Sequence, residues 1–549
     1  MSSSAVLLDG YVDEPACLGV PPYVAPEVRG LAGVLFERGY GVRYRTIDQL
    51  HLDPALLGEL DRADLVVVHA GTTVPGKYLA GTPATLDELR QLGRQLRNPT
   101  TAIGGPVLFG YAPGGGEWAV PPGLDDYDLL LAGHPAAALE AALAGADEPR
   151  GSYDYGVTDP FAVAGAAVLP QHPSFPHVVC ELETARGCAR EAVGGCSFCT
   201  EPFYGPPRYR STSAVGEEVA ALAAHGARHF RLGRQPDLLA YGAPPGADPV
   251  PDPDRIAALF AAVRAGAPDL LTLHIDNVNP GTIARHEEAA REALAAIVAG
   301  HTPGDVAAFG METADPAVIA ANNLKASPEE VFRAIEVVNE VGGLRADGIP
   351  ELLPGLNFVL GLVGETAATY DRNLAFLRRV LAANLLVRRI NIRRLMPFPG
   401  TQAHTMNTLG LHDREFRSFK ETVRDEIDRP MLERVFPIGS VVRHAVVERT
   451  GTLSLARPLG SYPILLGLPL TLPVGTVLDA AVVDHGQRSV TALPYPVPGN
   501  PLPLAALRWL PGVGKKRAAA VAAKRPFRSL EAWRRVAGET PIDHLLDLT

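Results

Sequence analysis

An alternation of strand-like and helix-like segments is the sequence feature that most constrains the fold of this chain. It extends from the first residues to about residue 432 of the 549. Strands that alternate with helices form parallel sheets, because each crossover helix returns the chain to begin the next strand beside the previous one. The sequence therefore predicts the α/β class, and the length allows several domains.

Residues 1–150 are expected to form one doubly wound domain. Helix signals cover Pro26–Gly39, and a buried strand is indicated at Leu65–His69. A capping box at Thr85–Glu88 opens another helix, since Thr and Glu three residues apart satisfy each other's free backbone amides. The segment 145–156, which contains Gly and Pro, is expected to be a linker.

Residues 170–432 repeat the pattern on a larger scale. One helix begins after Ser327, which precedes Pro328 and has Glu330 three residues later, as a capped helix start requires. Six βα units predict a partial or full (β/α) barrel, in which chemistry takes place at the carboxyl ends of the strands. The six strand candidates are Val178–Glu183, His229–Gly233, Thr272–Asn277, Ala307–Met311, Asn357–Gly361 and Arg389–Leu395.

The pattern changes after this region. Short strand signals at Val441–Val447, Thr476–Val483 and Ser489–Ala492 are broken by Gly and Pro. They predict a small β module over residues 433–497 that is a barrel of the OB type. Residues 500–549 are expected to be helical.

Composition excludes several classes of protein. Apolar residues make up 47% and charged residues 20%, as in globular chains rather than disordered ones. The net charge of −11 argues against a molecule that is basic throughout. The most apolar stretch, Tyr462–Val483, contains three prolines that would break a membrane-spanning helix, and Met1–Gly10 lacks a basic signal-peptide start. We expect a cytoplasmic protein with no membrane partner.

Three of the five cysteines form a cluster directly after the first barrel strand. Cys188, Cys196 and Cys199 are spaced C-x7-C-x2-C, on a loop at the predicted catalytic face. A [4Fe–4S] cluster ordinarily has four Cys ligands, so three leave one iron open to another ligand. A zinc site would need a fourth N or S ligand, and inert thiols are the other alternative. We favour the iron–sulfur hypothesis and expect Cys17 and Cys180 to be ordinary thiols.

This loop, with Phe198 before its last cysteine, resembles the cluster loop of the radical S-adenosylmethionine (SAM) superfamily. The resemblance covers about residues 173–403. It implies an enzyme whose [4Fe–4S] cluster, on Cys188, Cys196 and Cys199, binds SAM at the open iron. It also implies one-electron cleavage of SAM to methionine and a 5′-deoxyadenosyl radical, with the electron supplied by an external donor such as flavodoxin or ferredoxin. The exact reaction and the catalytic residues are not indicated.

The same resemblance suggests SAM contacts at the ends of four strands. The segment with Gly233 and Gln235 would hold the amino group, Glu312 the ribose, and Arg393 or Arg394 the carboxylate. The motif containing Asn357, Gly361 and Gly364 would lie against the adenine. Each has a structural alternative. Gly361 and Gly364 alone could form only a turn, Glu312 could only balance charge at a helix N-terminus, and at most one of two adjacent strand arginines can face the site.

An N-terminal doubly wound domain before such a barrel resembles a cobalamin-binding domain. The D-x-H-x-x-G signature, whose His ligates cobalt, is absent from the sequence. Cobalamin is therefore a possible cofactor without support from a motif. Other expectations are a ligand at Gly104–Pro106 and the Thr72–Tyr78 loop, or a purely structural domain.

The C-terminal segment resembles a helix-hairpin-helix motif for nucleic acid. Gly512 and Gly514 form the expected hairpin, and Lys515, Lys516 and Arg517 begin a basic helix. Hairpin amides and a helix N-terminus bind phosphate without reading bases. Nine Lys or Arg and one acid lie between Arg508 and Arg535. The alternative is a helical cap with a solvated basic face.

These features lead to three hypotheses. The first is a radical SAM enzyme that modifies a nucleic acid, most simply RNA such as tRNA. The second is the same chemistry on a small metabolite or cofactor precursor, and the third is a non-enzymatic, metal-stabilised protein that binds RNA or DNA. The order of the four parts resembles an uncharacterised, mainly archaeal group of radical SAM proteins.

Overall fold

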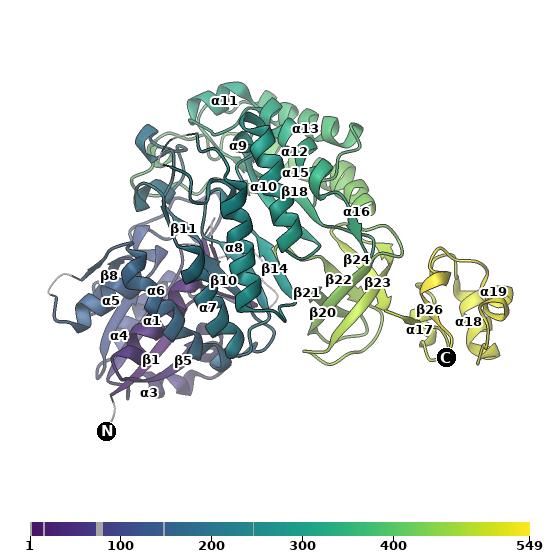
Figure 1. Cartoon of the computed structure of the whole chain (residues 1–549), viewed down its shortest axis with the longest axis horizontal. Coiled ribbons are helices and arrows are strands. Elements are labelled where there is room, and N and C mark those ends of the chain that lie inside the picture. Colours follow the sequence, from purple (N-terminus) through teal and green to yellow (C-terminus); the bar gives the residue numbers. More distant parts are fainter. Residues whose placement is uncertain (1–2, 15–16, 73–80, 147–148, 245, 247) are drawn as a thin grey trace.

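The computed structural model describes residues 3–14, 17–72, 81–146, 149–244, 246 and 248–549. Figure 1 shows the parts in chain order, from the purple N-terminal domain through the teal and green barrel to the yellow C-terminal helices. The predicted fold class is confirmed, because the first two parts contain parallel sheets and the third is a closed β-barrel. No helix among these residues is long and apolar enough to cross a membrane.

The N-terminal domain is a parallel sheet of six strands in the order β5-β1-β6-β7-β8-β9. The order reverses at β1, as in doubly wound sheets, so the carboxyl ends of the strands form a crevice. The strands are β1 (Ser4–Asp9), β5 (Gly41–Thr46), β6 (Leu65–His69), β7 (Thr100–Gly104), β8 (Leu129–Gly133) and β9 (Arg150–Gly151). The main helices are α1 (Pro26–Glu37), α2 (Ile47–Leu52), α4 (Leu86–Gln95) and α5 (Pro135–Leu143).

The prediction of a linker at residues 145–156 is wrong, because this segment contains regular secondary structure. Within it, β9 pairs in parallel with the end of β8 and adds a sixth strand to the sheet. Helix α6 (Tyr155–Ala164) also begins inside this segment. A two-residue strand shows no apolar alternation, because only its backbone hydrogen bonds hold it, so the sequence carried no signal for it.

The second part is a partial barrel rather than a closed one. The sheets β14-β13-β10-β4 and β15-β18-β19 are joined by a parallel bridge between Asn277 and Ala308. The six barrel strands are β10 (Val179–Glu183), β13 (His229–Gly233), β14 (Thr272–Ile275), β15 (Asp305–Glu312), β18 (Leu352–Leu360) and β19 (Arg389–Arg394). They confirm all six predicted strands.

Helices surround these strands on the outside (Figure 1). They are α7 (Thr212–Ala224), α8 (Pro253–Gly266), α9 (Pro280–Arg285), α10 (Glu287–Gly300), α11 (Pro316–Ala321), α12 (Pro328–Gly342), α13 (Ala367–Ala382), α15 (Asp413–Thr422) and α16 (Arg429–Val435). The capping box predicted at Ser327 is present at the start of α12.

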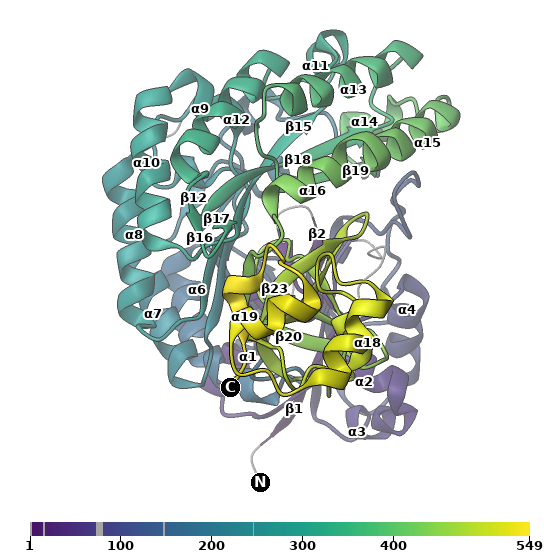
Figure 2. The ribbon, with the colours of Figure 1, turned by 90° about the vertical axis from the view of Figure 1, so that its right-hand side faces the viewer.

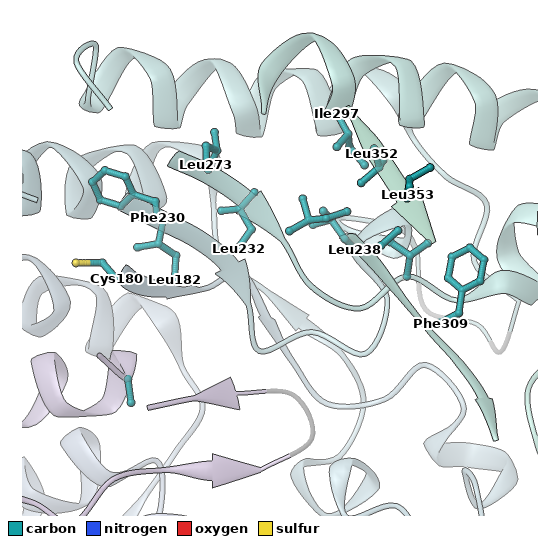
Figure 3. Close-up of a cluster of buried hydrophobic side chains, with 14 of the residues drawn as sticks. Cys180, Leu182, Phe230, Leu232, Leu238, Leu273, Ile297, Phe309, Leu352 and Leu353 are labelled. Carbon is teal, nitrogen blue, oxygen red and sulfur yellow. The ribbon is translucent and has the colours of Figure 1, made fainter. Parts of the chain in front are cut away.

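Large apolar side chains fill the space between strands and helices. Figure 3 shows Phe230 and Leu232 of β13 beside Leu182 of β10, and all three are fully buried. Cys180 belongs to the same cluster and has no exposed surface. Its position agrees with the expectation of an ordinary buried thiol.

One edge of the barrel is covered by the N-terminal domain. The short strand β4 (Tyr23–Val24) pairs in parallel with β10. Just beyond it, Arg29 of α1 enters the barrel wall, where it donates to Glu218 of α7 at 2.8 and 3.0 Å and to the Glu181 carbonyl at 2.5 Å. Glu218 accepts from Arg210 as well, at 2.5 Å. These buried, charge-assisted bonds hold the two parts in one arrangement.

The other edge carries a closed barrel of five strands in the order β20-β21-β22-β24-β23. Strands β22 and β24 are parallel, and the other neighbours are antiparallel. This confirms the small barrel expected from the sequence, and five strands in a closed Greek-key order suit the OB type. The strands are β20 (Val441–Arg449), β21 (Ser454–Pro458), β22 (Leu465–Leu468), β23 (Val477–His485) and β24 (Ser489–Pro494).

The loop between β21 and β22 enters the base of the larger barrel. Tyr462 donates to Asp276 at 3.1 Å, and the Ser461 hydroxyl donates to the Ile275 carbonyl at 2.7 Å. Arg231, buried between Glu181 and Asp276, is paired with both. At the amino-terminal end of the barrel, Thr272 at the start of β14 donates to the Leu459 carbonyl at 3.0 Å, so the loop enters there and reaches a buried charged layer.

Three helices end the chain: α17 (Leu504–Leu507), α18 (Lys515–Lys524) and α19 (Leu530–Ala537). Strand β25 (Val497–Pro498) pairs with β26 (Leu546–Asp547), which fixes both ends of this segment together. Trp533 and Leu507 share a core with Leu493 and Val483 of the small barrel. Figure 2 shows the yellow helices in front of that barrel.

The Arg29–Glu218 contact gives a first prediction. Burial alone would raise the pKa of Glu218, but Arg29 and Arg210 hold it below its usual value, so the carboxylate is charged at neutral pH. Glu218→Gln should lower the free energy of unfolding by about 3 kcal/mol, because it leaves two buried arginines poorly paired. The loss should be full at pH 7 and should shrink as the pH falls through the depressed pKa.

Urea denaturation followed by circular dichroism measures this effect. The control is Glu433→Gln, which removes an exposed pair with Arg429 and should change stability by about 0.5 kcal/mol or less. Equal stability of the two variants would contradict the assigned role of Arg29.

Candidate active site

The cysteine loop lies at the carboxyl end of the first barrel strand, as predicted. It follows β10 and is fastened to the segment after α11 by two asparagines. Asn322 accepts from the Ser197 hydroxyl at 2.7 Å, and the Asn323 side chain donates to the Gly195 carbonyl at 2.7 Å. Arg190 of the loop donates to the Asn323 carbonyl and side-chain oxygen at 2.8 Å. The loop therefore has a defined shape.

The start of the loop is a close approach of two backbone segments. Gly187 has φ of 96°, and a Cβ there would come within 2.5 Å of the Pro206 carbonyl oxygen. The next amide, that of Cys188, donates to the Gly205 carbonyl at 3.0 Å. A side chain at position 187 would break this contact, so the glycine is required by packing.

The three cysteines of the motif line one cavity. The same cavity is lined by Gln235, Asp237 and Lys325 among others. Within the described residues, no three His, Cys, Asp or Glu side chains come close enough to hold a single metal ion. The three thiols therefore share a cavity but are spaced more widely than the ligands of one ion.

Each thiol accepts a hydrogen bond from nitrogen. The Arg190 amide donates to Cys188 Sγ at 3.4 Å, and the Glu201 amide donates to Cys199 Sγ at 3.4 Å. The Arg190 guanidinium donates to Cys196 Sγ at 3.5 Å. Such donors stabilise thiolate ligands and tune the potential of a bound cluster.

Burial and the neighbouring positive charges shift the pKa values of these thiols in opposite directions. Burial raises the pKa of Cys196, while the positive charges of Lys325 and Arg190 lower it. Burial likewise raises the pKa of Cys188, and the Arg190 amide and Lys325 oppose that shift. Burial is the larger effect, so the pKa of Cys188, Cys196 and Cys199 lies above the usual thiol value, and iron would displace the thiol protons on binding.

Lys325 is the residue that sequence reasoning missed. It follows α11 in a short loop before α12, and its side chain lines the cavity together with the cysteines. Lys325 also lies over Gly310, where a Cβ would be 2.9 Å from Lys325 Cε and 2.5 Å from a Glu312 carboxylate oxygen. No spacing rule joins these positions, so only the folded chain brings them together.

The predicted SAM residues fall into two groups. Gln235 lines the cysteine cavity and is fixed by an accepted bond from Thr184 at 3.0 Å and a donated bond to the Leu232 carbonyl at 3.1 Å. Gly233 does not line it. A Cβ at Gly233 would lie 2.1 Å from Glu181 Oε1, so packing explains this glycine.

Glu312 ends β15 with φ of 60° and is 9% exposed. Burial raises the pKa of its carboxyl to about 7, although Lys325 and Arg393 pull it down. Glu312 therefore lies close to Lys325, and Lys325 lines the cysteine cavity. A residue held in the left-handed region at a strand end is a mark of functional sites.

The strand-five motif makes a tight turn. The Gly361 amide donates to both Glu365 oxygens at 2.9 Å, and the Leu362 amide donates to Glu365 at 3.0 Å. The Asn357 side chain donates to the Phe309 carbonyl at 3.3 Å. Gly364 completes the turn, and none of the three predicted residues lines the cysteine cavity. For Gly361 and Gly364, these contacts agree with the alternative that the two glycines form only a turn.

The two arginines of β19 point to opposite sides. Arg394 pairs with Asp413 at 3.0 Å and lies over the Phe416 ring at 4.5 Å, so it faces α15. Arg393, the next residue toward the start of the strand, lies on the opposite face and influences Glu312. It does not line the cysteine cavity. Arg393 remains the member of the pair predicted to face the site.

The N-terminal crevice holds a separate cavity of about 450 Å³. Gly105 and Pro106 of the predicted ligand segment line it, together with aromatic residues of the cysteine-loop side such as Phe203 and Tyr204. Residues 73–80, which contain most of the Thr72–Tyr78 loop named above, lie outside the described residues. The ligand of this domain stays a prediction.

The predicted hairpin in the C-terminal segment is open to approach. No atom lies within 4 Å of a Cβ built at Gly512 or Gly514, and Lys515, Lys516 and Arg517 are exposed at the start of α18. Val513 between the glycines is buried and anchors the turn. Arg517 donates to the Gly512 carbonyl at 3.1 Å, so its side chain also stabilises the hairpin.

Comparison with known proteins now identifies the family. Residues 182–377 match the radical SAM superfamily. An uncharacterized protein of Archaeoglobus fulgidus is 42% identical over 98% of this chain and 99% of its own length. The chain belongs to the radical SAM superfamily. An uncharacterized protein of Methanocaldococcus jannaschii is 38% identical over 89% of this chain and 93% of its own length, so these two relatives share most of its length.

A solved structure is similar as well. The radical S-adenosylmethionine methyltransferase TsrM from Kitasatospora setae matches with a TM-score of 0.49 and 16% identity. The match covers 73% of this chain and 75% of that chain.

Membership in the radical SAM superfamily implies a [4Fe–4S] cluster and SAM, and the residues present fit this pair. Three half-buried thiols with one donor each share a cavity, and each could bind a different iron. Gln235 and Lys325, which line the same cavity, offer polar contacts for SAM.

Substitution of one thiol tests the ligand assignment. Cys196→Ser should lower iron and acid-labile sulfide sharply after anaerobic reconstitution, because oxygen is a poor replacement for thiolate at iron. The control is Cys180→Ala, whose thiol lies in the apolar core of β10 and outside the cavity. Cys180→Ala should retain the wild-type iron content, and full iron content in Cys196→Ser would overturn the assignment.

A second substitution tests the missed lysine. Lys325→Met should weaken SAM binding by about tenfold, or about 1.4 kcal/mol, because it removes the cation beside the thiols and Glu312. Iron content should be unchanged, which separates this effect from loss of the cluster. Equilibrium dialysis of labelled SAM measures it, with the exposed Lys524→Met as control. Equal affinity in both variants would contradict a role for Lys325.

Proposed function

We propose that this radical SAM enzyme modifies a structured RNA such as tRNA. The observation that carries the proposal is the exposed Gly512–Gly514 hairpin followed by Lys515 and Lys516 at the start of α18. Backbone amides at a helix N-terminus and nearby cations bind the phosphates of nucleic acid without reading its bases.

Charge distribution supports this choice over a small substrate. The chain has a net charge of −11, yet the segment from Arg508 to Arg535 contains nine basic residues and one acid. Such a local reversal of charge is expected of a docking module for a polyanion. The segment shares a core with the small barrel, which itself lies against the radical SAM barrel. A polymer bound there is connected to the site through two packed domains.

In this proposal the residues of the cysteine cavity bind and orient the cofactors. Cys188, Cys196 and Cys199 would hold the cluster, and Gln235 and Lys325 would contact SAM. When bound, the two supply one-electron radical chemistry at an unactivated carbon, with the electron from an external donor. The positive charges of Arg190 and Lys325 oppose the rise in the pKa of Cys188 and Cys196 that burial causes, and so would ease deprotonation when iron binds. Phe198 packs with Leu362 and Leu395 in an apolar group and would limit access of water.

The C-terminal segment would act at a distance from the chemistry. Figure 1 shows it beyond the small barrel, at the opposite end of the molecule from the N-terminal domain. Docking there raises the effective concentration of the RNA at the barrel, since the second contact becomes intramolecular.

A salt-titrated RNA-binding assay tests the proposal. Lys515→Ala with Lys516→Ala should lower the affinity of the full chain for tRNA by about tenfold at low salt, which corresponds to about 1.4 kcal/mol. The double variant should also show a weaker dependence on salt, because fewer counterions are released. Arg517 is left intact because it also holds the hairpin.

The matched control is Arg62→Ala with Arg97→Ala, which removes the same charge from exposed positions of the N-terminal domain. That control should bind RNA like the wild type. If both double variants bind with wild-type affinity, the tail does not dock RNA and the proposal loses its support.

A further inference from the structure

A second polar cavity lies between the last barrel strand and the small barrel. It has a volume of about 410 Å³. Four arginines line it: Arg388 and Arg389 at the start of β19, Arg457 of β21, and Arg488 in the loop between β23 and β24. We refer to it as the arginine cavity. It is distinct from the cysteine cavity, with which it shares no lining residue.

Positive charge in this cavity is not balanced by the protein. Asp428 is the one carboxylate among the lining residues, and it is 3.5 Å from Arg488. Arg457 is 3.5 Å from Glu448. Within the described part of the chain, no carboxylate forms an ion pair with Arg388 or Arg389. Arg388 donates to the Tyr462 carbonyl at 2.8 Å, and Arg389 lies over the Tyr462 ring at 4.3 Å.

The electrostatics reflect this imbalance. Burial lowers the pKa of Arg388 to about 9, and the charges of Arg389 and Arg488 add to the shift. The pKa of Arg389 is lowered for the same reason, with Arg393 and Arg488 contributing. Like charges held together away from water destabilise a fold unless an anion joins them. A ligand with negative charge would relieve the repulsion.

The surroundings of the cavity indicate what the anion belongs to. In barrels of the OB type, the face of the second and third strands and the loop between the fourth and fifth bind oligonucleotides. Here those elements are β21, β22 and the loop that carries Arg488, and all three border the cavity. Arginine forks match the geometry of phosphate oxygens.

One face of β19 leads from the arginine cavity toward Glu312, which lies close to Lys325 of the cysteine cavity. Residues 389, 391 and 393 lie on one face of β19, because side chains alternate along a strand. Arg389 borders the arginine cavity, and Arg393 at the other end influences Glu312, which meets Lys325 over Gly310. The distance along the strand is roughly 13 Å for four residues. A polar row thus connects the arginine cavity with the carboxyl end of the barrel.

We propose that the arginine cavity binds backbone phosphates of the nucleic-acid substrate and directs the strand along β19 toward the cysteine cavity. This inference rests on the proposed function and names the site that positions the polymer at the barrel. It is separate from the C-terminal hairpin, which lies beyond the small barrel (Figure 1).

The test measures binding of a labelled single-stranded oligouridine by the full chain over a series of KCl concentrations. Arg457→Gln with Arg488→Gln should lower the slope of log affinity against log salt by about 1.4, since each phosphate contact to a single strand contributes about 0.7. Arg62→Gln with Arg97→Gln is the control and should keep the wild-type slope. Thermal unfolding of each variant checks that it is folded.

A measurement on the unaltered chain makes the test independent of folding of the variants. Bound RNA should protect Arg457 and Arg488 from modification by phenylglyoxal, as read by mass spectrometry, whereas Arg62 and Arg97 should stay reactive. Inorganic pyrophosphate at the same phosphate concentration is the second arm. Protection by pyrophosphate but not by RNA would assign the cavity to a small phosphate compound and overturn the proposal.

The outcomes separate this inference from the proposed function. If the wild type binds RNA but the arginine variants keep its slope and RNA protects neither arginine, the cavity inference is wrong and the proposed function stands. If the wild type binds no RNA at any salt concentration, both are wrong. A lowered slope together with protection by RNA supports the inference.

Discussion

The barrel of this protein does not close on itself, and the rest of the structure depends on how its two edges are covered. A parallel sheet with an open edge exposes backbone groups and the barrel interior to water. At one edge β4 adds a strand, and Arg29 fixes the N-terminal domain through Glu218. At the base, the loop with Ser461 and Tyr462 closes the interior over Arg231, Glu181 and Asp276. The flanking domains therefore cover the parts of the barrel that its own strands leave open.

The arrangement of the barrel and its flanking domains also determines where charged side chains gather. The carboxyl ends of the strands carry the cysteine loop, and two residues from after the fourth strand, Asn323 and Lys325, give the loop its shape and its positive charge. At the side, the edge strand β19 lies beside the small barrel, and its arginines face a cavity in which Asp428 is the one lining carboxylate. One face of β19 has Arg389 beside the arginine cavity at its start and Arg393 near Glu312 at its end. This order supports a path for a polyanion from the surface to the cofactor site.

Much of this fold could be predicted from the sequence because apolar runs identify buried strands. All six barrel strands were found, and His229–Gly233 was found with its exact bounds. The cysteine cluster could be found as well, since its ligands lie close together in the chain. Contacts between residues that are far apart in the sequence leave no pattern in the sequence from which they could be predicted. Arg190 and Asn323 are 133 positions apart, and Arg29 and Glu218 are 189 apart. The two-residue strand β9 and the arginine cavity were missed for the same reason, because backbone pairing and packing between domains decide them.

The most direct test is single-turnover consumption of SAM by the reduced, reconstituted full chain in the presence of RNA. Two RNA preparations are compared, one from cells that lack the gene for this protein and one from cells that carry it. If the enzyme acts on RNA, RNA from cells lacking the gene should accelerate consumption of SAM, and RNA that already carries the modification should not. Equal rates with both preparations and without RNA would contradict the account.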